Sequence, residues 1–158
     1  MSKLRDDRRM PLDIREISGG SLHGLIPLLA SEGLPTEDVA EPERRFFAFL
    51  DAGGATLGYG GLERAEGDML LRSVVTRPMC RGAGHGRAIT EWLIGEAARS
   101  GARDLYLLTT TARDYFAKLG FETIERTSVP PAIAMCREFS LLCPVTAITM
   151  RRRLRGMS

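Results

Sequence analysis

Apolar and polar residues alternate with two different periods in the first part of this chain of 158 residues. Alternation at period two over residues 12–17 predicts a half-buried strand. A helix-like spacing of leucine and isoleucine over residues 22–32 predicts a helix that stops at Gly33 and Pro35. Pro27 lies inside this segment, where a proline removes one helical hydrogen bond. The chain is therefore expected to begin with a strand followed by an interrupted helix.

Three strand-like segments come next, at residues 46–50, 56–63 and 69–76. The turns between them, at residues 51–54 and 65–68, are short and contain glycine, which is typical of β-hairpins. These segments predict an antiparallel meander.

Helical and strand-like periods alternate in the rest of the chain. Strands are predicted at residues 105–109, 121–124 and 147–150, and helices at residues 86–99, 112–119 and 131–139. Grouped strands followed by alternating helices and strands indicate an α+β or mixed α/β fold with a mixed sheet, rather than a regular doubly wound fold. Because no repeat or linker interrupts this order, we expect one domain over residues 12–154 after a flexible, charged tail over residues 1–11.

Composition supports a globular domain and excludes other classes. Apolar residues make up 44% of the chain, yet no segment approaches the roughly 18 continuous apolar residues of a membrane helix. The net charge of +2 lacks the basic excess typical of nucleic-acid-binding domains. We therefore expect neither a membrane nor a nucleic-acid partner. The basic run Arg151 to Arg153, with Arg155, is expected to be a solvated tail, with contact to an anionic surface as the alternative.

Cysteine usage and the amino end predict a compartment. Cys80, Cys136 and Cys143 form no CxxC pair, and the amino end lacks the apolar region of a secretory signal. Both features favour the reducing cytoplasm. Cys136 and Cys143 are expected to be small buried residues, with binding of a soft metalloid as the alternative.

Three glycines alternate at the start of the helix predicted after residue 86. Gly82, Gly84 and Gly86 directly follow a predicted strand and Arg81. Unpaired backbone N–H groups and the helix dipole favour an anion at such a helix start, and glycine lets the backbone approach it closely. The spacing excludes a dinucleotide GxGxxG motif, and the chain has no Gly-Lys pair for a Walker A loop. The sequence therefore predicts a phosphate or pyrophosphate cradle.

Two segments resemble the signatures of the GNAT acetyltransferase superfamily. Residues 74–88 look like its acyl-CoA pyrophosphate loop, and residues 115–121 look like the helix and turn beside the pantetheine arm. The resemblance extends over residues 12–154. It implies a mixed central sheet flanked by helices, whose fourth and fifth strands, residues 70–76 and 105–109, splay apart to admit acetyl-CoA.

Within the superfamily, residues 71–75, 107–111 and 139–144 look most like the bacterial arsenic-resistance N-acetyltransferases. The short N-acetylglutamate synthase domains are similar in the same stretches. The resemblance implies acetyl-CoA-dependent transfer of an acetyl group to the amine of a small amino-acid-like substrate, with no metal. A non-catalytic acyl-CoA-binding or metalloid-sensing module is the alternative, and the sequence leaves open whether two chains share the final strand in a homodimer.

The resemblance also implies which residues bind acetyl-CoA. They come from the loop, from the strand before it and from the second signature: Arg81, Gly82, Ala83, Gly84, His85, Gly86, Arg87, Val74, Val75 and Phe116. Most relatives have a tyrosine in place of Phe116, where its hydroxyl protonates the departing CoA thiolate, although N-acetylglutamate synthases are similar in having phenylalanine. Tyr115 points about 100° away on a helix and is a poor substitute, so water is the alternative proton donor.

The acceptor side requires a base, because an amine must lose a proton before it attacks a thioester. Glu63 at the end of a predicted strand is the expected base, with an exposed turn-flanking carboxylate as the alternative. Arg72 lies in an apolar strand and is costly to bury alone, so we expect it to hold a substrate carboxylate or to form a structural salt bridge. Thr109 and Thr110 are expected to add hydrogen bonds to the substrate or to cap the next helix.

Overall fold

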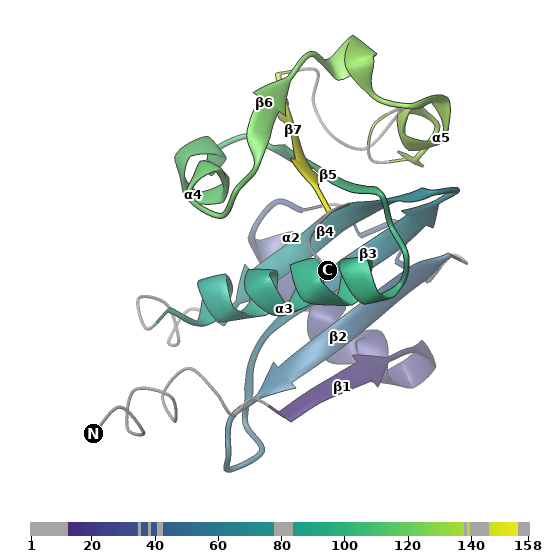
Figure 1. The fold of residues 1–158 in the computed structure, drawn as a ribbon. Helices are drawn as coiled ribbons and strands as arrows, with labels where there is room; N and C mark the ends of the chain where they lie inside the picture. Colours follow the sequence, from purple (N-terminus) through teal and green to yellow (C-terminus); the bar gives the residue numbers. More distant parts are fainter. Residues whose placement is uncertain are drawn as a thin grey trace.

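In a computed structural model, the protein has a seven-stranded mixed sheet with helices on both faces (Figure 1). The structure describes residues 13–34, 36–37, 39–40, 43–77, 84–137, 139 and 146–154. The strands are β1 (Asp13–Ile17), β2 (Arg44–Leu50), β3 (Thr56–Ala65), β4 (Asp68–Thr76), β5 (Asp104–Thr109), β6 (Glu122–Ile124) and β7 (Ile148–Arg153). The helices are η1 (Gly19–Gly24), α2 (Leu25–Ser31), α3 (His85–Arg99), α4 (Arg113–Ala117), η3 (Arg126–Ser128) and α5 (Pro131–Ala134). The predicted tail over residues 1–11 lies outside the described residues.

The strand order is β1-β2-β3-β4-β5-β7-β6. β2, β3 and β4 form the predicted antiparallel meander, and β1 extends it by pairing antiparallel with β2. Side chains of β2 alternate between the two faces of the sheet. Phe47 and Phe49 belong to the apolar cluster that also contains Leu93 of α3. Phe46 packs instead into the cluster that contains Leu29 of α2. The two helices therefore cover opposite faces, with α3 in front of the sheet and α2 behind it in Figure 1.

The parallel pair in the middle of the sheet is short. β4 and β5 pair only at Met69 with Leu105 and at Leu70 with Tyr106. Beyond these residues β4 stays paired with β3, while β5 pairs along its whole length with β7. The splayed fourth and fifth strands expected from the sequence are thus confirmed.

Two helical segments differ from their sequence prediction. The segment predicted as one helix over residues 22–32 divides into the 3-10 turn η1 and the helix α2. Pro27 is the third residue of α2, in the first turn, where its backbone nitrogen has no helical partner to lose. The helix predicted over residues 131–139 ends at Ala134.

The arginine run near the carboxyl end is part of the sheet, and its prediction as a solvated tail is wrong for residues 151–153. β7 continues through Arg153, and Arg151 forms an ion pair with Glu122 of β6, with 3.2 Å between Nε and Oε2. Arg152 donates a hydrogen bond to the backbone oxygen of Leu119 at 2.9 Å. Partners on the neighbouring strand and turn therefore hold these side chains, which no local sequence pattern indicates.

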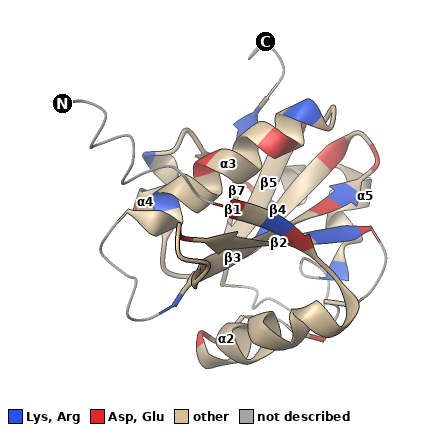
Figure 2. Ribbon diagram, turned by 90° about the horizontal axis from the view of Figure 1, so that it is seen from below, with Lys and Arg blue, Asp and Glu red and all other residues tan. Residues whose placement is uncertain are grey.

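Charged residues of both signs are interspersed over the sheet and α3, whereas α2 carries none within its bounds (Figure 2). None of the helices in the described part of the chain is long and apolar enough to cross a membrane.

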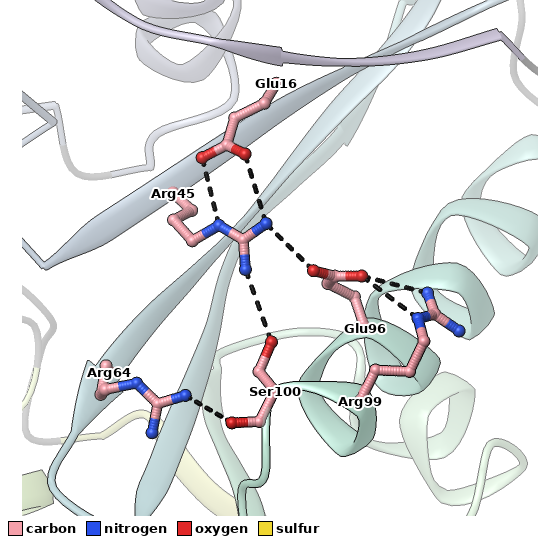
Figure 3. Close-up of polar contacts among 6 residues, drawn as sticks. All are labelled: Glu16, Arg45, Arg64, Glu96, Arg99 and Ser100. Carbon is pink, nitrogen blue, oxygen red and sulfur yellow. Dashed lines mark hydrogen bonds and ion pairs between the residues drawn. The ribbon is translucent and has the colours of Figure 1, made fainter.

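A polar network ties the first strands to the carboxyl end of α3 (Figure 3). Arg45 of β2 binds both carboxylate oxygens of Glu16 on β1, at 3.1 and 3.2 Å. The same guanidinium contacts Glu96 of α3 at 3.0 Å, and Arg64 of β3 donates to the backbone oxygen of Ser100 at 2.7 Å. The hydrogen bond to Glu16 is the main cause that raises the pKa of Arg45. The network fixes α3 across the meander and so positions the opposite end of that helix beside β4.

Close packing between β3 and its neighbours requires glycine at Gly58. A Cβ atom there would lie 2.4 Å from the backbone oxygen of Val75 and 2.9 Å from Cδ1 of Ile89. We expect Gly58→Ala to lower the free energy of unfolding by about 2 kcal/mol, because β4 has to shift. Urea denaturation measures this change. In Gly53→Ala the Cβ would touch only Oδ1 of Asp51 at 3.5 Å, so equal losses in the two variants would contradict this interpretation.

Candidate functional site

A cavity of about 620 Å³ opens where β4 and β5 diverge. Its lining comes from the end of α2, from β4, from the start of α3, from the end of β5 and the turn after it, from α4 and from the start of β7: residues 32–34, 71–76, 84–87, 107–112, 115, 116 and 147. Segments far apart in the sequence therefore share one hollow at the open edge of the parallel pair.

The cavity is lined by residues from both faces of the sheet. Val74 packs on the cluster that contains α3, whereas the next residue, Val75, packs in the cluster that contains α2. The lining from α3 and α4 lies on the first face, and residues 32–34 lie at the end of the helix that covers the second face. A ligand that passes between the diverging strands can therefore present its end to a second molecule on the other side.

β4 contains a bulge at the cavity. Tyr59 pairs with Val75 but Gly61 pairs with Arg72, so β4 has one more residue than β3 between these pairs. Ser73 in this interval has a φ of +62°, which is the left-handed region that a residue with a side chain seldom adopts. A bulge leaves backbone N–H and C=O groups outside the hydrogen-bonded ladder of the sheet. Such groups are available to a ligand here, because Ser73 and Val74 both line the cavity.

The start of α3 has the geometry that the sequence predicts for an anion site. Gly84 precedes the helix with a φ of +82°, and among the described residues no side chain caps the helix. The first N–H groups of a helix have no partner inside it, and they carry the positive end of the dipole. Gly84, His85, Gly86 and Arg87, which are predicted to belong to the acyl-CoA pyrophosphate loop, all line the cavity. Arg81, Gly82 and Ala83, predicted to form the rest of the loop, lie outside the described residues.

Two adjacent aromatic residues of α4 line the cavity. Phe116 packs edge-on against Phe121, with 5.8 Å between ring centroids. Tyr115 hydrogen-bonds Thr90 of α3, and its hydroxyl is 3.1 Å from the position a Cβ on Gly86 would take. Burial raises the pKa of Tyr115, so its hydroxyl stays protonated at neutral pH. The tyrosine hydroxyl is therefore at the first turn of α3.

Glu63 and Arg72 contact each other. Oε1 of Glu63 is 3.2 Å from Nη1 of Arg72, and its Oε2 is 3.3 Å from Nη2 of Arg44. The Arg72 side chain has an exposed fraction of 0%, lies over the Phe46 ring and contacts Oγ of Ser73 at 3.3 Å. Arg72 belongs to the cavity lining and Glu63 does not. This geometry is the structural salt bridge that the sequence left open for Arg72, and it surrounds Glu63 with cations.

Thr109 and Thr110 both line the cavity. Oγ1 of Thr109 accepts a hydrogen bond from the backbone N–H of Ala112 at 3.0 Å, which is the helix-capping alternative. Its hydroxyl hydrogen remains available as a donor. Both threonines can therefore contribute to binding at this edge.

Sequence reasoning missed the lining residues Glu32, Gly33 and Leu34. In the sequence, Gly33 and Pro35 were informative only as a stop signal for the preceding helix. No local signal shows that this helix ends beside β4, because that position depends on packing against the sheet.

The described residues contain no group of three or more His, Cys, Asp or Glu side chains suited to a metal ion. Cys136 is buried, and its Sγ contacts the backbone oxygen of Ala132 at 3.5 Å. Cys80 and Cys143 lie outside the described residues. The predicted burial of Cys136 is thus confirmed.

Comparisons with known proteins point to one family. The sequence model of the acetyltransferase (GNAT) domain matches residues 42–123, just over half of the chain. None of the curated proteins matches the sequence at a significant level.

Solved structures share the fold. N-acetylglutamate synthase from Neisseria gonorrhoeae, in complex with coenzyme A and N-acetyl-glutamate, has a TM-score of 0.75 and 21% identity, over 92% of this chain and 35% of the synthase. A GNAT-family acetyltransferase from Staphylococcus aureus Mu50 has a TM-score of 0.72 and 16% identity, over 92% and 100% of the two chains. Rv2747 from Mycobacterium tuberculosis has a TM-score of 0.72 and 21% identity, over 90% and 99%. The chain thus spans about a third of the synthase, and these similarities establish the fold.

Proposed function

The chain belongs to the GNAT acetyltransferase family, and on that premise we propose that it transfers the acetyl group of acetyl-CoA to the amine of a small amino-acid-like molecule. The observation that carries the proposal is the cavity between β4 and β5, which joins the anion site at the start of α3 to the opposite face of the sheet. A long, extended thioester with a phosphorylated end fits a cavity of this form.

Each part of the cavity has a role in this proposal. The N–H groups at the start of α3 and the predicted loop with Arg81, Gly82 and Ala83 hold the pyrophosphate. The extended arm lies along Val74 and Val75, where an added chain makes the backbone hydrogen bonds that β5 does not. The two residues of α4, including Phe116, cover its apolar portion.

The chemistry is direct attack. The neutral amine nitrogen forms a bond to the carbonyl carbon and loses one proton to solvent. The carbon–sulfur bond breaks, and the thiolate takes a proton from solvent. A thiol with a pKa near that of free cysteine, about 8.5, leaves without a dedicated acid. This matters because Phe116 carries no hydroxyl, and the hydroxyl of Tyr115 is held at the first turn of α3.

The finer assignment of the acceptor rests on sequence resemblance. Similarity to the arsenic-resistance N-acetyltransferases favours an arsenic-containing amino acid, and similarity to N-acetylglutamate synthases favours glutamate. The Neisseria gonorrhoeae synthase has been solved with N-acetyl-glutamate and with L-arginine. We extend the proposal to a single domain over residues 12–154, a cytoplasmic location and a homodimer. The second candidate function is an acyl-CoA-binding module without catalysis, favoured by the phenylalanine at position 116.

Thermal unfolding with acetyl-CoA tests the proposal first. Ligand at about 100 times its Kd stabilises the folded state by roughly 2.7 kcal/mol, which raises the unfolding temperature measurably. Thiol release from acetyl-CoA is then followed with the free amino acids and an arsenic-containing amino acid as acceptors. No thermal shift at millimolar acetyl-CoA would overturn the assignment. Binding without thiol release for any acceptor would favour the binding module instead.

A further inference from the structure

We propose that Tyr115 is a positioning residue for the phosphate end of acetyl-CoA, because its hydroxyl fixes the first turn of α3 through Thr90. The inference rests on the proposed function and deepens it. It concerns the affinity for the thioester and assigns no proton transfer to the hydroxyl. The contacts that carry it join α4 to α3 at the end of the cavity where the phosphates are proposed to bind.

Two hydrogen bonds in series lead from α4 to the start of α3. Oγ1 of Thr90 donates to the backbone oxygen of Gly86 at 2.8 Å, and the hydroxyl of Tyr115 is hydrogen-bonded to the Thr90 side chain. A threonine hydroxyl has a single hydrogen, which this geometry commits to Gly86. Tyr115 is therefore the donor in the other bond. Burial raises the pKa of Tyr115, so the hydrogen for this bond is present at neutral pH.

The bond from Tyr115 controls the orientation of the Thr90 hydroxyl. Thr90 is fully buried, with an exposed fraction of 0%, so solvent does not supply this contact. A buried hydroxyl that loses a partner costs free energy. A threonine hydroxyl bonded to the carbonyl four residues earlier also changes the local direction of a helix. Holding the Thr90 hydroxyl on Gly86 thus fixes the direction in which the first N–H groups of α3 point.

The ring of Tyr115 is held by its aromatic neighbours. It packs edge-on against Phe116, with 5.1 Å between the ring centroids, and Phe116 packs in the same way on the buried Phe121. Tyr115 also lines the cavity. A packed aromatic cluster therefore presents the hydroxyl to α3 beside the space proposed for the thioester.

The hydroxyl meets α3 at the turn that is proposed to hold the pyrophosphate. Gly86 is the second residue of the helix, among the N–H groups that have no partner inside it. The Tyr115 hydroxyl is 3.1 Å from the position that a Cβ on Gly86 would take, and it comes this close because glycine has no side chain. A turn that is already held in position loses less freedom when an anion binds, which raises the affinity.

The experiment compares two thioesters in Tyr115→Phe, which keeps the ring and removes the hydroxyl. Acetyl-CoA carries the phosphates, whereas S-acetylpantetheine has the same thioester and arm without them. We expect the Kd and the KM for acetyl-CoA to rise roughly 3- to 10-fold, the effect of one hydrogen bond, with kcat changed less than about twofold. The kcat/KM for S-acetylpantetheine stays at the wild-type level. Calorimetry measures the Kd, and thiol release measures the rates.

Tyr106→Phe is the matched control. The hydroxyl of Tyr106 on β5 is hydrogen-bonded to Arg151, and this residue does not line the cavity. The same chemical change there should leave the Kd for acetyl-CoA within about twofold of wild type.

Variants of Thr90 separate the hydrogen bonds from packing. Thr90→Val keeps the shape and removes the hydroxyl, so we expect it to weaken acetyl-CoA as much as Tyr115→Phe does. Thr90→Ser keeps the hydroxyl and should bind like wild type. Tyr115→Phe/Thr90→Val should lose little more than either single variant, because the two bonds act in series. An effect of packing alone gives the opposite order, since serine loses a methyl group and valine does not.

Four outcomes overturn the inference. One is an equal Kd for acetyl-CoA in wild type and Tyr115→Phe, and another is a Thr90→Ser variant weaker than Thr90→Val. An equal loss with both thioesters assigns the hydroxyl to the arm instead of the phosphates. A lower kcat with both thioesters at an unchanged Kd assigns it to proton transfer.

Failure of the proposed function is a separate result. Wild-type protein that gives no thermal shift with acetyl-CoA overturns that function and the role of Tyr115 with it. Wild-type protein that binds acetyl-CoA but releases no thiol with any acceptor overturns only the transfer reaction, and the Kd values of the variants then decide the role of Tyr115.

Discussion

Replacing Arg72 by leucine is expected to lower the free energy of unfolding by about 3 kcal/mol, because the change leaves a buried carboxylate without one of its cations. Glu63 has an exposed side-chain fraction of only 6%, and it shares its two oxygens between Arg72 and Arg44. Arg44 remains in the variant, so we expect a loss near the lower end of the range for broken buried ion pairs. Urea denaturation with linear extrapolation measures it.

A double variant and an exposed control separate the causes. Arg72→Leu/Glu63→Leu removes both charges and should lose less than the sum of the two single variants, because each single variant already loses the Arg72–Glu63 contact, and in the double variant only Arg44 still loses its contact with Glu63. Arg15→Leu breaks a pair with Asp13 at 3.0 Å whose members are more than half exposed, and it should change stability little.

The same variant tests the expectation that Arg72 holds a substrate carboxylate. If Arg72→Leu keeps its stability and binds acetyl-CoA but fails to acetylate amino acids, Arg72 binds the substrate and the structural interpretation is wrong. Unchanged turnover in a folded variant excludes the substrate role.

Gly86→Leu is expected to weaken acetyl-CoA binding about 100-fold, equivalent to about 2.8 kcal/mol at 1.4 kcal/mol per tenfold change. A Cβ at this position would already lie 3.1 Å from the hydroxyl of Tyr115, and the rest of a leucine has to extend into the cavity or displace that ring. Gly86 is the second residue of α3, so the added side chain obstructs the N–H groups proposed to hold phosphate. Isothermal titration calorimetry with acetyl-CoA measures the affinity.

Gly95→Leu is the matched control on the same helix. A Cβ there would meet only the guanidinium end of Arg99, at 3.1 Å, and Gly95 does not line the cavity. Leucine favours helix over glycine at both positions, so propensity alone predicts a gain in stability for each variant. Equal affinities in the two variants would place the phosphate elsewhere than the start of α3.

Elements with a clear local period were predictable from sequence. The predicted helix 86–99 and strand 69–76 correspond to α3 at His85–Arg99 and β4 at Asp68–Thr76. The helix α3 buries one face and the strand β4 buries both, and burial sets the spacing of their apolar residues. The end of β7 was not predictable, because Arg151 and Arg152 are polar and are held in the strand by partners on neighbouring segments.

The cavity was predictable on one side only. Gly84 and Gly86 form a local pattern at the start of α3, and the anion binding predicted from it depends only on the helix that begins there. Tyr115 was expected to point away from the site, yet it lines the cavity beside Phe116, because the cavity extends around α4 to the first turn of α3. Ser73 has no sequence signal at all, since its left-handed backbone arises from the register between β3 and β4.

By itself, the sequence determined the order of strands and helices, the glycine-rich start of α3 and the resemblance to the acetyltransferase superfamily. Each of these depends on residues that are neighbours in the chain, at spacings of two to four. Only the tertiary structure decided the partner of Arg72 and the place of Tyr115. In the register of β3 and β4, Arg72 lies opposite Gly61 and thus diagonal to Glu63 on one face, while Arg44 lies opposite Glu63 on β2. Such contacts join residues remote in sequence, and strand register and helix packing set them rather than any local period.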